Sequence, residues 1–238
     1  MIYFKVIKPI LSMALFSLLA FSHVSFAQLS PHQVIEAKTT EVISLIKKGK
    51  TTYKTKPTAF FQEVEHSLDG ILDFRLFARN VMGSYGSAKT YSTFTPAQKK
   101  QFNTRLDRFS RSFKKSLISK YGLALLLFEG QKIEVAPPSE AAKKNIKQLK
   151  PIKVFQYFYN DKKERYTIEY IMKVNSKNKW MIRNIIVQPN INIGKIYRRQ
   201  FATSMKKHNN IDKVIDIWSV DAPIASSTKE SVKKRLTK

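Results

Sequence analysis

Acidic side chains that could work as an acid–base pair gather in one segment of the chain. Asp69 and Asp73 lie four residues apart, and Glu63 and Glu65 lie close by. Paired carboxylates can exchange protons with a substrate when one of them is desolvated. The alternative, which we favour, is that these acids are helix caps or surface charges. Glu169 is predicted to lie opposite the apolar face of a strand, and therefore in solvent.

Other residue types offer little further chemistry. The chain has four histidines and no cysteine, and His32, His66 and His208 are far apart in sequence. The sequence contains no HExxH, no GxSxG and no glycine-rich phosphate loop. It therefore predicts a binding protein and not an enzyme, with no metal site and no resident cofactor.

Helices are predicted for the first part of the chain. Apolar residues recur at helical spacing over 31–48, 57–68 and 73–82, whereas 50–56 reads as a loop and 84–94 as a turn-rich connection. Thr95, Pro96 and Gln98 form a capping box that should begin a helix reaching about residue 121. This long helix carries an apolar ridge on one side, formed by Phe102, Leu106, Phe109, Phe113 and Leu117.

Strand patterns follow. Strands are predicted over 131–136, 152–159, 165–174 and 180–188, and helices return after Gly194 and again near 211–218. The order predicts an α+β fold in which a helical layer covers one face of a four-stranded antiparallel curved sheet. Such a layer over a concave sheet often leaves an apolar pocket between the two.

The first 27 residues read as a secretory signal peptide. Lys5 and Lys8 precede an apolar run over 10–21, and Ala27 ends a small-residue cleavage site. We expect a mature chain that starts near Gln28, lies in the periplasm of a Gram-negative cell, and forms one domain over 28–220. Residues 221–238 are expected to be a disordered basic tail.

The net charge of +26 favours anionic partners. Acidic protein faces and phospholipid headgroups fit an exported chain better than nucleic acid does, and no nucleic-acid motif is present. A generally basic exported proteome is an equally good explanation of the charge.

Four sequence blocks resemble the MlaC family, also called the toluene-tolerance auxiliary family. The resemblance covers nearly the whole mature chain. The blocks are 71–75 (ILDFR) with 79–83 (RNVMG), 94–98 (FTPAQ) with 120–121 (KY), 180–185 (WMIRNI), and 191–194 (INIG) with 197–201 (YRRQF). The chain departs from the family pattern at two places. Asn184 stands where an Asp is common in the family, and 188–190 (QPN) replaces the usual acidic residue followed by Gly. No function of that acidic residue is therefore assigned to this chain.

The resemblance implies a monomeric periplasmic protein that binds glycerophospholipid as its cargo. Its partners would be an outer-membrane lipoprotein–porin complex and the MCE-type ring of an inner-membrane ABC transporter. The residues proposed to line the lipid pocket come from two helices and the sheet: Phe74, Phe77, Val81, Phe102, Leu106, Phe109, Phe113, Ile168, Tyr170, Met172, Trp180 and Ile182.

Two other functions remain open at this point. A periplasmic holdase chaperone for unfolded outer-membrane proteins would also use a basic, apolar-lined surface. A small-molecule enzyme on a similar α+β fold would need a buried acid–base pair facing the cavity.

Overall fold

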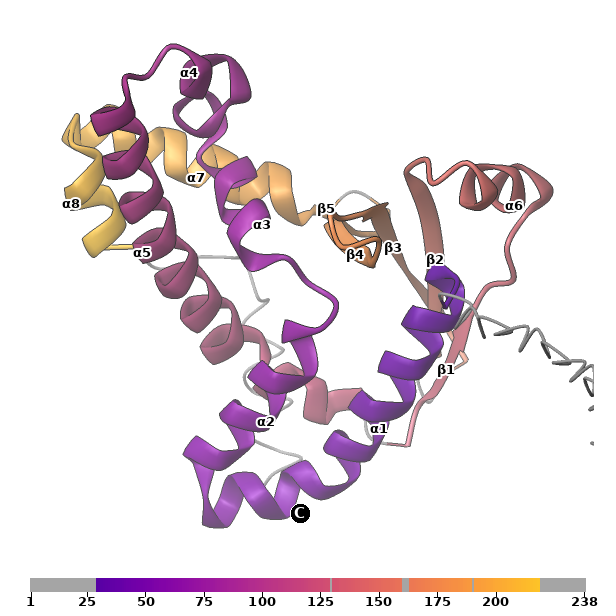
Figure 1. Ribbon diagram of the computed structural model, residues 1–238. Helices are drawn as coiled ribbons and strands as arrows, with labels where there is room; N and C mark the ends of the chain where they lie inside the picture. The colour runs from indigo at the N-terminus through magenta and orange to yellow at the C-terminus, as the bar shows by residue number, and fades with distance from the viewer. Residues whose placement is uncertain (1–28, 129, 160–162, 190, 219–238) are drawn as a thin grey trace, which may run out of the picture.

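A computed structural model describes residues 29–218 except 129, 160–162 and 190. The proposed leader and basic tail lie outside the described residues. Helices fill the first part of the chain, an antiparallel sheet follows, and two helices close it (Figure 1). The helical elements before the sheet are α1 (Pro31–Thr55), α2 (Pro57–Asp69), α3 (Phe74–Val81), η1 (Gly83–Gly86), α4 (Ala88–Ser92), α5 (Pro96–Tyr121) and η2 (Leu123–Phe128).

The predicted capping box begins α5. The hydroxyl of Thr95 accepts a hydrogen bond from the Gln98 amide, and the Gln98 side chain accepts one from the Thr95 amide. Ser30 and Gln33 make the same reciprocal pair at the start of α1. Each pair satisfies two backbone N–H groups that have no partner inside the helix.

The predicted loop over 50–56 is wrong, because α1 continues to Thr55. Gly49, which directly follows the predicted end of the first helix, is a point of close approach between elements. A Cβ atom on Gly49 would lie 2.8 Å from both Leu126 and Phe60. The glycine is therefore required by the packing of α2 and η2 against α1. The connection over 84–94 also contains the short helices η1 and α4.

The sheet is an open antiparallel meander in the order β1-β2-β3-β4-β5. Its strands are β1 (Lys132–Val135), β2 (Ile152–Tyr159), β3 (Arg165–Val174), β4 (Trp180–Val187) and β5 (Ile191–Asn192), and α6 (Glu140–Lys147) lies between β1 and β2. The prediction of four strands therefore misses β5, which is too short to show alternation. A register shift between Ile171 and Met172 interrupts the pairing of β3 with β4.

The segment before α3 extends the sheet at β4. Leu72 forms a parallel bridge with Ile182, and the Ile182 amide donates to the Ile71 carbonyl at 2.8 Å. The outer side of β4 is thus paired with Leu72 near its start and with β5 near its end.

The main core lies where α3, α5 and the C-terminal helices α7 (Ile193–His208) and α8 (Ile211–Asp216) meet. Phe77 stacks on Phe113, with ring centroids 5.4 Å apart, and Phe109 packs edge-on against Trp218 at 4.9 Å. The apolar ridge predicted for the long helix therefore faces closely packed aromatic rings.

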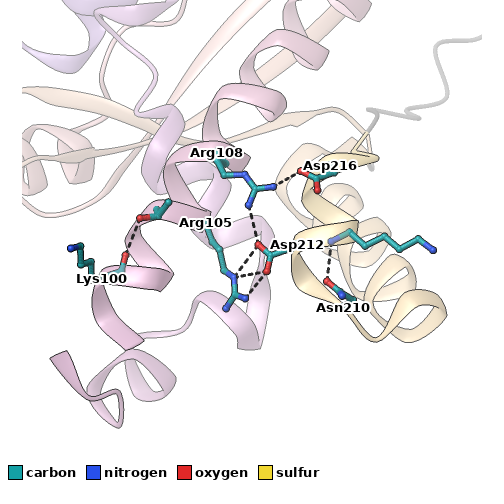
Figure 2. Close-up of polar contacts among 8 residues, drawn as sticks. Lys100, Arg105, Arg108, Asn210, Asp212 and Asp216 are labelled. Atoms are coloured by element: carbon teal, nitrogen blue, oxygen red, sulfur yellow. Dashed lines mark hydrogen bonds and ion pairs between the residues drawn. The ribbon is translucent and has the colours of Figure 1, made fainter. Parts of the chain in front are cut away.

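Ion pairs hold α8 against α5 on the outside of this core (Figure 2). Arg105 reaches both carboxylate oxygens of Asp212, through an Nη2–Oδ2 contact of 2.5 Å and two Nε contacts of 3.1 Å. Arg108 donates to Asp212 Oδ1 at 3.0 Å and also to Asp216. Arg105 and Arg108 of α5 thus join this helix to α8.

Candidate functional site

A cavity of about 210 Å³ lies between α1 and the concave face of the sheet. The segment before α3 and residues of η2 complete its wall. Twelve of the sixteen lining side chains are apolar: Ile35, Val42, Ile46, Leu68, Ile71, Leu72, Leu125, Ile133, Phe158, Ile168, Ile182 and Ile185. Strand alternation explains the contributions of β2 and β3 to this wall, because residues two apart on a strand face the same way. Ile182 and Ile185 of β4 are three apart and share this face because of the register shift between β3 and β4.

The four polar lining residues are Lys38, Thr39, Gln156 and Tyr170, and three of them form one hydrogen-bonded chain. The Tyr170 hydroxyl donates to Gln156 Oε1 at 2.7 Å, and Gln156 Nε2 donates to the Thr39 hydroxyl. Thr39 in turn donates to the Ile35 carbonyl one turn back in α1, at 2.7 Å. Burial raises the pKa of Tyr170, so its hydroxyl stays protonated and remains a donor. This series of hydrogen bonds links α1 to β2 and β3.

Lys38 extends the polar side of the cavity toward solvent. Its ammonium group pairs with Glu41 at 2.5 Å, and its side chain is 27% exposed. A long lysine side chain can keep its stem along apolar surface while its charge stays in water. The cavity therefore combines a mainly apolar wall with a hydrogen-bonding side and a cation at its rim.

The volume of this cavity is below the roughly 300–1,000 Å³ typical of small-molecule pockets. A bulky apolar ligand requires α1 or the 70–72 segment to move away from the sheet. Thr39 on α1 carries the hydrogen bond that such a movement would break.

The structure brings three of the twelve predicted lipid-contacting residues to this cavity: Ile168, Tyr170 and Ile182. Eight others belong to the closely packed main core and do not line the cavity: Phe74, Val81, Phe102, Leu106, Phe109, Phe113, Met172 and Trp180. Phe77 also lies in the main core and borders a separate polar pocket.

The contribution of α1 is absent from the predicted site. Ile35, Val42 and Ile46 were recognised as an apolar helix face, but nothing local indicates which surface that face covers. The position of Ile185 in the cavity wall could not be predicted from the sequence either. The register shift near Met172 brings Tyr170 opposite Ile185, and both line the cavity.

Three of the four acidic residues have the structural roles that we favoured, and the fourth, Glu63, borders a separate pocket that also includes Glu41 and His66. Asp73 caps α3 by accepting from the Leu76 amide at 2.9 Å and pairs with Arg183. Glu65 and Asp69 both pair with Lys114 of α5, at 2.7 and 2.5 Å. None of these carboxylates lines the cavity between α1 and the sheet.

The prediction that Glu169 is solvated is wrong. Its side chain is only 5% exposed, pairs with Lys153 at 2.8 Å, and accepts from Gln188 Nε2 at 3.2 Å. It lies on the face of β3 opposite the cavity, as alternation requires, but neighbouring side chains cover it. The Lys153 ammonium and the Gln188 side-chain amide offset the cost of burying this carboxylate.

No group of three or more His, Asp or Glu residues suited to hold a metal ion occurs within the described part of the chain. His32 is buried near the start of α1, and its desolvation lowers its pKa, with the nearby Glu36 opposing the shift.

Three comparisons relate the chain to known proteins. Residues 36–220 match the family model described as MlaC protein. Over 222 residues the chain is 31% identical to the toluene tolerance protein ttg2D of Pseudomonas putida, covering 93% of this chain and 94% of that protein. The fold is similar to that of a phospholipid-binding protein from Ralstonia solanacearum solved in complex with a phospholipid. That match has a TM-score of 0.63 at 18% identity, and covers 88% of this chain and 100% of the other.

Proposed function

The chain belongs to the MlaC protein family, and on that premise we propose that it is a periplasmic phospholipid carrier. It would shuttle glycerophospholipid between an outer-membrane lipoprotein–porin complex and the MCE-type ring of an inner-membrane ABC transporter. In doing so it would maintain the lipid asymmetry of the outer membrane. The Ralstonia solanacearum protein with the same fold is described as binding a phospholipid, which supports this substrate class.

The observation that carries the proposal is the amphipathic character of the cavity between α1 and the sheet. Its wall is mainly apolar, and Thr39, Gln156 and Tyr170 supply hydrogen-bonding groups on one side. An acyl chain would lie along the apolar wall, and ester and phosphate oxygens would lie toward the polar side and Lys38.

The energetics suit a carrier. Each buried methylene contributes about 0.8 kcal/mol, so one long acyl chain is worth on the order of 10 kcal/mol before ordering costs. Since tail burial alone supplies this affinity, recognition of the headgroup can remain loose. The cavity has to widen to accept the tails, and separation of α1 from the sheet is the simplest way for it to do so.

The lining of the cavity also favours transport over catalysis. The cavity lining contains no carboxylate and no imidazole among the residues that the structure describes, so it offers no acid–base pair. In that same part of the chain, no helix is both long and apolar enough to cross a bilayer. We propose the periplasm as the location, since the first 27 residues read as a cleaved leader.

Lipid extraction tests the proposal most directly. The protein purified from a Gram-negative host should release phospholipid on organic extraction, in about one-to-one ratio by native mass spectrometry. Delipidated protein should take up phospholipid from liposomes and pass it to a purified MCE-type ring. If neither co-purified lipid nor liposome uptake is found, the proposal is wrong.

The holdase alternative predicts a different outcome in the same experiment. It requires capture of unfolded outer-membrane proteins and suppression of their aggregation, with oligomers rather than a monomer with one bound lipid.

A further inference from the structure

A second pocket, with a volume of about 330 Å³, opens where β4, β5 and the start of α7 meet α3. It differs from the cavity in being lined mainly by polar side chains. The residues around it are Phe77, Asn80, Arg183, Asn184, Asn192, Gly194, Lys195 and Arg198.

Cations dominate this second pocket. Arg183, Lys195 and Arg198 line it, and no carboxylate does. Arg183 pairs with Asp73 at 2.9 Å, outside the lining. Among the described residues, no carboxylate forms an ion pair with Lys195 or Arg198 within 4.0 Å. The pocket therefore keeps an excess of positive charge.

Several donors of the pocket are left for a ligand. The Arg183 side chain is only 14% exposed, and its Nε is buried without a hydrogen-bond partner in the structure. Arg198 uses its Nε to bond the Asn80 carbonyl at 3.0 Å, which holds the guanidinium beside the pocket. A buried donor without an acceptor costs about 1–3 kcal/mol, so an anion that supplies one gains affinity.

Two side-chain acceptors around the pocket, on Asn184 and Asn192, are already occupied. Asn184 Oδ1 accepts from the Gly194 amide at 3.0 Å, and Asn192 Oδ1 accepts from the Lys195 amide at 2.9 Å. These bonds also satisfy the amides of Gly194 and Lys195 in the first turn of α7, so the anion would be held mainly by side chains rather than by these two amides. A pocket with free donors, occupied acceptors and excess positive charge fits an anion and not a cation.

Strand β4 separates this pocket from the cavity. Ile182 and Ile185 line the cavity, whereas Arg183 and Asn184, which lie between them in sequence, line the pocket. We propose that the pocket bounded by Arg183, Lys195 and Arg198 binds a phosphate group, either of free phosphate or a phosphate ester or of a phospholipid headgroup. Bidentate contacts from guanidinium groups are the usual way in which proteins hold phosphate oxygens.

The test is a titration of the purified protein with inorganic phosphate and with glycerol phosphate at constant ionic strength. Amide NMR shifts of Gly194 and Lys195 would be the readout, with sodium chloride as the blank. We expect saturable binding that Lys195→Glu weakens by about tenfold or more. Arg199→Glu makes the same charge change on an exposed α7 residue outside the pocket, and should weaken binding less than about twofold.

Asn184→Asp is an isosteric second test. It keeps an acceptor for the Gly194 amide, removes the Asn184 Nδ2 donor that bonds Asn192 Oδ1, and adds a negative charge beside Arg183. Phosphate binding should therefore fall about tenfold or more, with the fold intact by circular dichroism. The proposal is overturned if shifts match the chloride blank, or if Arg199→Glu weakens binding as much as Lys195→Glu.

The source of the phosphate group is distinguished by repeating the titration on lipid-loaded protein. Unchanged affinity assigns the pocket to free phosphate or a phosphate ester, whereas loss of phosphate binding on loading assigns it to the headgroup of the bound lipid. The phosphate titration on delipidated protein does not depend on lipid binding in the cavity, so failure of one proposal is distinguishable from failure of the other.

Discussion

The hydroxyl of Tyr170 on β3 donates a 2.7 Å hydrogen bond to Gln156 on β2, inside a cavity whose wall is otherwise mostly apolar. Gln156 is 4% exposed, and its Nε2 donates a hydrogen bond to the Thr39 hydroxyl of α1. These three side chains are the polar link between the N-terminal helix and the sheet. They therefore contribute to the cost of moving α1 away from the sheet, together with the buried apolar side chains of that helix.

Thr39→Val should weaken this link without changing the size of the side chain. Gln156 Nε2 would lose its acceptor, and a buried donor left unpaired costs about 1–3 kcal/mol. Urea unfolding would show a lower midpoint, and lipid uptake from liposomes should become faster. Thr40→Val is the matched control, because exposed Thr40 bonds only the Glu36 carbonyl. Equal effects of the two changes would contradict a special role for Thr39.

Ile185→Trp should fill the cavity. The larger side chain would occupy the space proposed for an acyl chain, so lipid loading should fall by about tenfold or more. Ile186→Trp is the control, since Ile186 pairs with Glu169 on the opposite face of the sheet. Mass spectrometry of the extracted lipid measures both variants, and equal loading in both would mean that the lipid lies elsewhere.

Asp212→Asn should loosen α8 from α5. Asp212 is 39% exposed and pairs with both Arg105 and Arg108, so we expect a loss of no more than about 1 kcal/mol, smaller at high salt. Asp107→Asn, which removes a single exposed pair with Arg75, should cost less. Thermal unfolding of the two variants in low and high salt gives the comparison.

The effect of Asp212→Asn should also depend on pH. The hydrogen bond from Arg105 lowers the pKa of Asp212 below its ordinary value of 3.8. Its contribution to stability is therefore complete above that value and is lost as the pH falls through the lowered pKa. The difference in melting temperature between Asp212→Asn and the unchanged protein should disappear in strong acid. A difference that persists there would contradict an ionic origin.

His32 should make the protein less stable in mild acid. Burial lowers its pKa in the folded state below the ordinary 6.5, so the unfolded chain takes up its proton first. The stability that this provides is complete above pH 6.5 and is lost as the pH falls toward the lowered value. His32→Leu should flatten the unfolding free energy between about pH 7 and pH 5, and NMR titration of the imidazole would give the pKa directly.

Features encoded by neighbouring residues could be predicted from the sequence. The capping box at Thr95 fixed the start of α5, and alternation gave β2 and β3 their observed bounds. The long α1 could not be predicted because Gly49 is set by its contacts with Phe60 and Leu126, which are distant in sequence. The burial of Glu169 was missed for a similar reason, since Lys153 and Gln188 come from neighbouring parts of the sheet.

The site was harder to predict than the fold. Large aromatic residues such as Phe109 and Phe113 were placed in the pocket because they are bulky, but bulk allows them to fill space completely, and both are 0% exposed. Branched residues on β3 and β4 and the inner face of α1 surround the remaining space. Which faces leave a gap depends on how α1 lies over the sheet, and local spacing carries no information about that.

The pairing of β4 on its outer side has a consequence for the proposed opening of the cavity. Leu72 pairs with one end of this strand and β5 with the other, so both ends of its outer backbone are already paired. Unpaired strand edges are where separate chains begin to join into aggregates. If α1 lifts while β4 keeps both neighbours, the apolar interior can be exposed to cargo without offering this edge to another polypeptide.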